Sequence, residues 1–120
     1  REDIEGAFRL FEEKNATSVV SVTECEHSPL WSNTLNEDKS MSSFIRDDVL
    51  GIRSQDLPSY FRLNGAIYIA KMSTIETDKS FFNLPDSYAY VMESSHSVDI
   101  DDKLDFEFAE FLFSKRAKDN

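Results

Sequence analysis

Two acidic residues in the segment "SVDIDDKLDF", Asp99 and Asp101, are the strongest candidates for chemistry in this sequence. If residues 98–101 are extended, the two-residue period of a strand places both carboxylates on one face. Two carboxylates on one face suit a divalent cation such as Mg²⁺, which prefers oxygen ligands. The alternative is that Asp101 or Asp102 caps the helix that follows, with Asp105 adding negative charge to its first turn. Spacing alone leaves both interpretations open.

A second candidate is the stretch "FRLNGAIYIA", residues 61–70, in which polar residues lead into an apolar strand. In α/β sheets, ligand-contacting groups collect at strand ends, where a Gly admits close approach and an Asn both donates and accepts hydrogen bonds. Asn64 and Gly65 fit that pattern. The fork-shaped guanidinium of Arg62 suits a carboxylate or a phosphate. The alternative is that Asn64-Gly65 is a tight turn between two strands, a frequent use of this dipeptide.

Other residues carry weaker signals. Phe81 and Phe82 could wall a sugar pocket, although adjacent aromatic residues more often belong to a core. His27 has no recognisable partner for base catalysis, and Cys25, the one cysteine in the sequence, is expected to be an inert buried thiol. The sequence contains no Gly-rich loop of the kind that cradles phosphates.

The elements that must position these residues follow from hydrophobic periodicity. Ile4, Ala7, Phe8 and Phe11 recur at helical spacing, and Asn15 can end that first helix. Strands are expected at 18–22, 65–70 and 87–92, and further helices at 71–78 and 103–115, the last with an apolar stripe made of Leu104, Phe108, Phe111 and Leu112. Strands that alternate with helices predict an α/β layered fold with a mostly parallel sheet flanked by helices.

Residues 23–58 form a polar excursion between the first two strands. The segment contains Pro29 and only sparse apolar anchors, namely Leu30, Trp31, Leu35, Met41, Phe44 and Ile45. These anchors are too few for a core of their own but are sufficient to pack on a partner surface, which indicates an oligomer contact.

Length and charge limit the classes of partner. The chain has 120 residues and a net charge of −10, which indicates one domain or part of a larger one and argues against binding to nucleic acid or anionic membranes. A single cysteine and the lack of an apolar run of roughly 18 residues fit a cytoplasmic protein. Because a helical pattern begins directly at Arg1, we expect the chain to be the second part of a longer polypeptide.

Five motifs occur in a recognisable order: "SVVSV", "HSPLW", "RSQDLPSYFRLNGAIYIA", "SFF" and "SVDIDDKLDF". Together they resemble the C-terminal half of the CMP-N-acetylneuraminate synthetases, the cytidylyltransferases that activate sialic acid, over nearly the whole chain. The resemblance implies a Rossmann-like fold of the nucleotide-diphospho-sugar transferase type. It also implies that residues 1–120 are the C-terminal part of a cytidylyltransferase domain, with 24–57 as the dimerisation excursion of a homodimer.

The resemblance further implies transfer of CMP from CTP to a sialic-acid-type 2-keto sugar acid, with release of pyrophosphate and a requirement for Mg²⁺. On this basis Asp99 and Asp101 would hold the metal and act in catalysis. The residues implied around the sugar acid are Arg53, Gln55, Arg62, Asn64, Tyr68, Phe81 and Phe82. Two departures stand out, because many relatives carry consecutive arginines where this chain has Arg53-Ser54, and some carry a Lys where it has Trp31.

Two alternatives to this function stay open. The nucleotide-binding half of the family precedes the matching region and contains a Gly-rich basic loop, so the present chain alone is expected not to turn over substrate. The chain could instead be a noncatalytic binding or assembly module that kept the dimer surface. It could also belong to a synthetase for legionaminic or a related nonulosonic acid, since a single acyl or hydroxyl difference is worth only about 1–3 kcal/mol in an apolar pocket.

Overall fold

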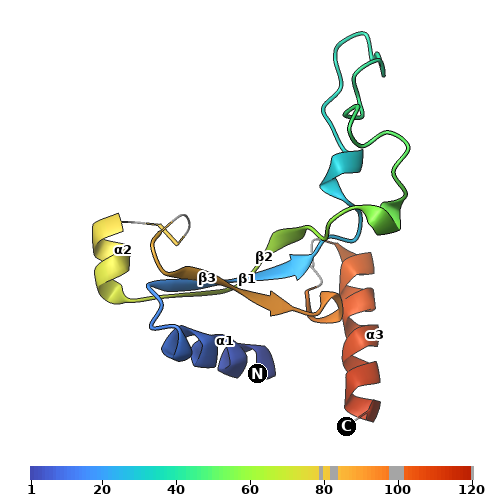
Figure 1. The fold of residues 1–120 in the computed structure, drawn as a ribbon. Helices are drawn as coiled ribbons and strands as arrows, with labels where there is room; N and C mark the ends of the chain where they lie inside the picture. The colour runs from blue at the N-terminus through green and yellow to red at the C-terminus, as the bar shows by residue number, and fades with distance from the viewer. Residues whose placement is uncertain (79, 82–83, 98–101, 120) are drawn as a thin grey trace. The chain divides into compact units, whose positions relative to one another are not determined.

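The computed structural model describes residues 1–78, 80–81, 84–97 and 102–119 (Figure 1). Its elements in chain order are α1 (Glu2–Glu13), β1 (Ser18–Glu24), η1 (Pro29–Trp31), η2 (Ser54–Asp56), β2 (Phe61–Ala70), α2 (Met72–Asp78), β3 (Ser87–Met92), η3 (Ser94–His96) and α3 (Lys103–Asp119), where η denotes a 3₁₀ turn. The chain forms two compact units. Unit 1 comprises Arg1–Thr23 and Leu63–Asn120, and unit 2 comprises Glu24–Arg62.

The sheet of unit 1 has three strands in the order β2-β1-β3. β1 and β3 are parallel, in a register that runs from Ser18 opposite Ser87 to Thr23 opposite Met92. β2 is antiparallel to β1. The backbone N–H of Ile67 in β2 donates to the hydroxyl oxygen of Ser21, and the N–H of Lys71, just after β2, donates to the carbonyl of Thr17, just before β1. Residue numbers therefore rise along β2 while they fall along β1. Of the mostly parallel sheet that was predicted, only the β1–β3 pair is therefore parallel, and the sheet is mixed.

One face of this sheet packs on α1 and forms the core. Ala7, Ala16 and Val19 are fully buried there, and the side chains packed around them are Leu10, Phe11, Ile67, Ile69, Tyr88 and Tyr90. β1 is buried along most of its length, as its β-branched sequence predicts. Of the predicted helical stripe, Ala7 and Phe11 face this core, whereas Ile4 and Phe8 are 51% and 50% exposed.

The end of α1 confirms the predicted role of Asn15. This residue has a φ of 47°, the left-handed conformation that Asn tolerates better than most residues. The backbone N–H of Asn15 donates to the carbonyl of Glu12, and that of Ala16 donates to Phe11. These two bonds satisfy carbonyls that would otherwise be left unpaired at the helix end, so the chain turns directly from α1 into β1.

The first turn of α1 is fixed to the sheet by a polar cluster around Asp3. One carboxylate oxygen of Asp3 accepts a hydrogen bond from the Tyr90 hydroxyl at 3.1 Å, and the other lies 2.9 Å from Nδ1 of His96. Burial, followed by the hydrogen bond and the negative charge of Asp3, raises the pKa of Tyr90 above its ordinary value. The folded chain therefore holds the phenolic proton of Tyr90 more tightly than the unfolded chain does.

This linkage predicts a pH dependence of stability at high pH. Because the unfolded tyrosine loses its proton near about pH 10 and the folded one only at higher pH, the contribution of Tyr90 to stability is complete below pH 10 and is lost above it. The replacement Tyr90→Phe should remove this part of the slope above about pH 10. Urea unfolding at stepped pH measures it, with Tyr60→Phe as the control; equal slopes for the unmodified protein and Tyr90→Phe would contradict the prediction.

Two regions of the structure expose large apolar side chains. α3 forms as predicted, but its apolar side chains do not gather in one stripe: Leu104, Phe108 and Phe111 are 72%, 52% and 61% exposed, and Phe106 and Phe113, on the opposite side of the helix, are also exposed. Within residues 24–62, all of which the structure describes, Val49 is the one buried apolar side chain. Unit 2 is mainly loop with the two short turns η1 and η2 (Figure 1). Among the described residues, no helix has the length and apolar character needed to cross a membrane.

Candidate functional site

The residues predicted to bind substrate fall into three groups. Arg53, Gln55 and Arg62 lie in unit 2, and Asn64, Tyr68 and Phe81 lie in unit 1. Phe82, Asp99 and Asp101 lie outside the described residues.

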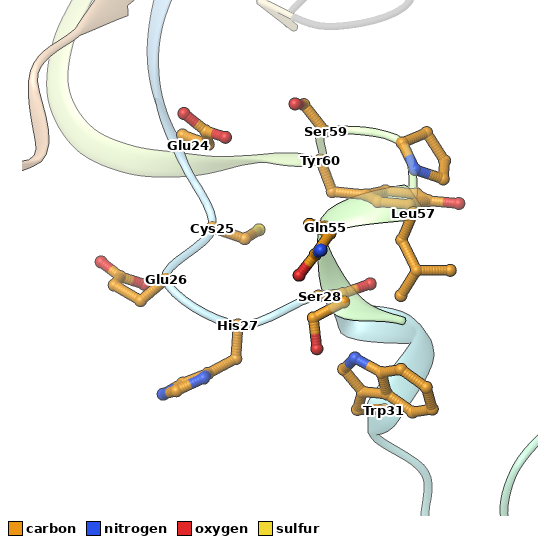
Figure 2. Close-up of a pocket in the computed structure, with 12 residues that line it drawn as sticks. Glu24, Cys25, Glu26, His27, Ser28, Trp31, Gln55, Leu57, Ser59 and Tyr60 are labelled. Carbon is orange, nitrogen blue, oxygen red and sulfur yellow. The ribbon is translucent and has the colours of Figure 1, made fainter. Parts of the chain in front are cut away.

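Unit 2 contains a polar cavity of about 310 Å³ (Figure 2). Its walls come from the segment after β1 and from the segment around η2, which are joined by a hydrogen bond of 2.8 Å from the backbone N–H of Cys25 to the carbonyl of Tyr60. Figure 2 shows the Gln55 amide and the Cys25 thiol facing each other, while the His27 ring points away. Gln55 therefore lines this cavity, and Trp31 lies in its wall.

Arg62 is joined to a carboxylate of the same unit. Its Nη2 lies 2.9 Å and its Nε 3.4 Å from the two carboxylate oxygens of Glu26, which lines the cavity. The hydrogen bond from Arg62 is the main cause that lowers the pKa of Glu26. Arg53 makes a similar pair with Asp56 at 2.9 Å, in a more exposed position. Both guanidinium groups thus pair with carboxylates of their own chain.

The Arg62–Glu26 pair predicts a measurable pKa change. Replacement of Arg62 by Gln should raise the pKa of Glu26 toward the ordinary glutamate value, because the charged hydrogen-bond donor is lost. The pair stabilises the folded chain fully at pH values above the ordinary glutamate pKa. This stabilisation is lost as the pH falls through the lowered pKa of Glu26 in the folded state. Carbon-13 NMR titration of the Glu26 carboxyl measures the change. Arg46→Gln, which breaks a pair with Asp48, is the control and should leave Glu26 unchanged.

Asn64 lies inside β2, so the interpretation of Asn64-Gly65 as a tight turn between strands is wrong. Gly65 has a φ of 70°, which L side chains rarely adopt. The side chain of Asn64 bonds to Ser21, and Ile67 packs on the core that contains Val19. Asn64 and Ile67 thus lie on one face although they are three residues apart, whereas a regular strand puts residues an even number apart on one face. One extra residue must lie between them, which identifies a β-bulge at Gly65.

The amide of Asn64 is 8% exposed and uses all its hydrogen-bonding capacity within unit 1. Its Oδ1 accepts from the Ser21 hydroxyl and from the backbone N–H of Ala66. Its Nδ2 donates to the Ser97 hydroxyl at 2.9 Å and to the sulfur of Met92 at 3.3 Å. Because the N–H of Ala66 must meet an oxygen, the amide orientation is fixed. The arrangement makes Asn64 a residue that orders the sheet.

Tyr68 and Phe81 meet on the other face of the sheet. Their rings pack edge to face with centroids 5.3 Å apart and planes at 62°. Ile67 and Ile69 face the core, so Tyr68 between them points away from α1. The bulge therefore places the side chains of Asn64 and Tyr68 on opposite faces, although a regular strand would put both on one face. The structure brings Tyr68 and Phe81 together and separates them from Asn64.

The acidic segment is bounded by two described residues with defined partners. Ser97, which is 6% exposed, accepts from Asn64 and donates to the carbonyl of Glu93. Asp102 accepts a hydrogen bond of 2.8 Å from the backbone N–H of Asp105, so it is the N-cap of α3. The capping interpretation is confirmed for Asp102, and α3 needs no cap from Asp101. The described residues contain no group of three or more His, Cys, Asp or Glu side chains that could hold a metal ion.

Sequence reasoning missed four buried or half-buried serines that support these residues, namely Ser18, Ser21, Ser87 and Ser97. A signal for two of them was present, because "SVVSV" puts hydroxyls into a strand predicted to be buried on both faces. Buried hydroxyls need partners, so such serines indicate a tertiary hydrogen bond. The identity of the partner depends on the fold and could not be inferred.

Comparison with known proteins gives relatives of one kind. The chain is 34% identical over 103 residues to the N-acylneuraminate cytidylyltransferase of Streptococcus agalactiae serotype V, covering 86% of the chain and 24% of that protein. It is 32% identical over 101 residues to the CMP-N,N'-diacetyllegionaminic acid synthase of Legionella pneumophila, covering 79% and 40% respectively. It is 36% identical over 80 residues to the N-acylneuraminate cytidylyltransferase of Escherichia coli O18:K1:H7, covering 67% and 19%. The chain thus spans less than half the length of each relative, and no protein-family profile matches it.

Proposed function

Because this chain is homologous to part of the acylneuraminate cytidylyltransferases, which confirms the predicted resemblance, we propose that it forms part of an enzyme that transfers CMP from CTP to a sialic-acid-type 2-keto sugar acid. The observation that carries the proposal is that relatives named for sialic acid and for legionaminic acid both align with most of the chain. In this reaction the anomeric hydroxyl attacks the α-phosphorus of CTP and pyrophosphate leaves. Catalysis of such transfers consists mainly of positioning and charge neutralisation.

Five described candidate residues have a role in this proposal that their surroundings support. Arg62 and Arg53 bind the carboxylate of the sugar acid, in exchange for the glutamate and aspartate that they hold in the free chain. Gln55 offers its amide to sugar hydroxyls, because it lines a polar cavity. Tyr68 and Phe81, together with Phe82, supply an apolar surface for the N-acyl arm.

Asp99 and Asp101 are proposed as the ligands of Mg²⁺. Support comes from their spacing and from Asp102, which caps α3 and so leaves these two carboxylates outside the capping role. The ion would supply positive charge against the phosphates of CTP. To bind the ion, the two carboxylates need a backbone that is held in place. The buried Ser97 anchors the chain two residues before Asp99.

Unit 2 is proposed as the dimerisation element of a homodimer. It exposes five large apolar side chains, Leu35, Met41, Leu50, Ile52 and Phe61, by 58%, 62%, 59%, 38% and 49%. Apolar side chains gathered on a segment with little core of its own are typical of an interface. A cytoplasmic location agrees with the single cysteine and with a reaction that consumes CTP.

A pyrophosphate-release assay tests the function. The polypeptide as the cell makes it is incubated with CTP, Mg²⁺ and either N-acetylneuraminic or N,N'-diacetyllegionaminic acid, and the 120-residue chain alone is assayed in parallel. We expect release with at least one acid from the former and none from the latter, since the sequence contains no Gly-rich phosphate loop. Sugar-acid binding without any release would favour the noncatalytic module and overturn the enzymatic proposal.

A further inference from the structure

Two serine hydroxyls in unit 1 converge on the backbone carbonyl of Phe81. Oγ of Ser18, which is fully buried, lies 2.9 Å from this oxygen, and Oγ of Ser87 lies 3.0 Å from it. The two hydroxyls are also 2.6 Å from each other. Ser18 and Ser87 begin β1 and β3 and stand opposite each other in the parallel register. The neighbouring strands therefore present both hydroxyls at one point.

The hydrogen count explains how this group holds the carbonyl. Each serine hydroxyl has one hydrogen to donate, so two hydrogens serve three close contacts. One arrangement passes a hydrogen bond from one serine to the other and then to Phe81, and the other directs both hydrogens at the carbonyl. In each arrangement the Phe81 carbonyl is an acceptor for at least one hydroxyl. Removal of one serine leaves the other able to donate, whereas removal of both releases the carbonyl.

The side chain of Phe81 lies where a ligand could contact it. Its ring packs against Tyr68, and it also lines a hollow of about 330 Å³ on the sheet face opposite α1. Val20, Val22 and Leu84 give this hollow apolar walls. The half-buried ring of Phe81 thus lines the hollow, and the backbone of this residue is held by two hydroxyls at the first residues of β1 and β3.

We propose that Ser18 and Ser87 are positioning residues that set Phe81 against Tyr68 and thereby determine which N-acyl group the enzyme prefers. The inference rests on the proposed function, in which these aromatic residues contact the acyl arm. A pocket that discriminates between acyl groups differing by one methylene must keep its wall in place, because such a difference changes selectivity only about 10- to 200-fold even in a well-formed pocket. A wall carried by a loop needs an anchor on the sheet, and the two hydroxyls supply it.

The test uses variants that differ only in the hydroxyl. Ser87→Thr keeps the hydroxyl and Ser87→Val replaces it by a methyl of the same shape, in a strand position that favours β-branched residues. Ser18→Ala completes a double-mutant cycle. We expect Ser87→Thr to behave as the unmodified protein and each loss of one hydroxyl to have a small effect. The double variant should raise KM for the sugar acid about tenfold, with kcat within about twofold, and should lower selectivity between N-acetyl and N-propanoyl forms at least about fivefold.

The control is Thr17→Val, which removes a hydroxyl that donates to the carbonyl of Pro85 in the same connection but not to Phe81. It should match the double variant in the sign of its change in melting temperature, but it should leave KM and acyl selectivity unchanged. The proposal is overturned if the double variant has the same acyl selectivity as Thr17→Val. It is also overturned if Ser87→Val and Ser87→Thr have equal selectivity and the effect of the double variant is the sum of the effects of the two single changes.

A second readout separates this inference from the proposed function. Saturation-transfer NMR reports contact of the acyl methyl group with the protein and does not require turnover. If that signal depends on the Ser18 and Ser87 hydroxyls while no pyrophosphate is released, the inference stands and the enzymatic proposal falls. If pyrophosphate is released normally and neither selectivity nor the acyl signal responds to the variants, the inference falls and the enzymatic proposal stands.

Discussion

Replacement of Asp99 or Asp101 by Asn should lower the rate of pyrophosphate release by at least about 100-fold, because each change removes a charged oxygen ligand from the proposed Mg²⁺ site. Asn keeps the shape of Asp and removes the charge, so the fold should be retained. A second measurement does not depend on turnover: electron paramagnetic resonance should show weaker binding of Mn²⁺, used as a substitute for Mg²⁺, by either variant.

The neighbouring residue offers a matched control for this experiment. Asp102→Asn removes the same charge only one residue away from Asp101, but it keeps the cap of α3, since Asn caps a helix about as well as Asp. It should bind Mn²⁺ and release pyrophosphate almost as the unmodified protein does. Equal losses at 99, 101 and 102 would indicate a general effect of acidic charge and would contradict a specific metal site.

Replacement of Asn64 by Leu should lower the free energy of unfolding by about 3 kcal/mol, because it leaves several buried polar groups without a partner. The backbone N–H of Ala66 would lose its acceptor, and the hydroxyl of Ser97 would lose its donor. Asn64→Asp should also be destabilising, since an oxygen would replace the amide nitrogen that faces Ser97 and Met92. Urea unfolding followed by circular dichroism measures both changes.

Asn33 is the control for the Asn64 experiment. Its side chain also both donates and accepts, to the carbonyl of Phe44 and from the N–H of Thr34, but the residue is exposed. Water can satisfy these groups when the side chain is lost, so Asn33→Leu should cost less than about 1 kcal/mol. Similar costs for Asn33→Leu and Asn64→Leu would show that the buried network does not stabilise the sheet.

Local periodicity was sufficient to predict most elements. The end of α1 at Asn15 and the bounds of β3 follow from residues close in sequence, so no knowledge of tertiary contacts was needed. The direction of β2 was not predicted, because strand direction depends on which distant strand it pairs with. The start of β2 at Phe61 was also missed, since Asn64-Gly65 carries the signature of a turn as well as that of a bulge.

The candidate site was less accessible to sequence reasoning. Tyr68 and Phe81 were both predicted at a pocket, and they do touch, but the hydroxyls that hold the Phe81 carbonyl lie more than 60 residues away or on another strand. The resemblance placed Asn64 and Tyr68 around one pocket, and a regular strand would also put these two even-numbered residues on one face. The left-handed conformation at Gly65 makes β2 irregular and puts the two side chains on opposite faces, and nothing in a single sequence distinguishes that conformation from a turn.

The extra residue in β2 also makes the backbone conformation at Gly65 a determinant of sidedness. If residue 65 took an extended conformation with a negative φ and no residue were lost, the strand would become regular, and the residues before it would turn by half a repeat with respect to those after it. Leu63 would then be directed at Ser21, and the amide of Asn64 would emerge beside Tyr68 on the face without α1. The torsion angles of one glycine therefore decide whether a polar group is inside the sheet or available to solvent, while the composition of the strand stays the same.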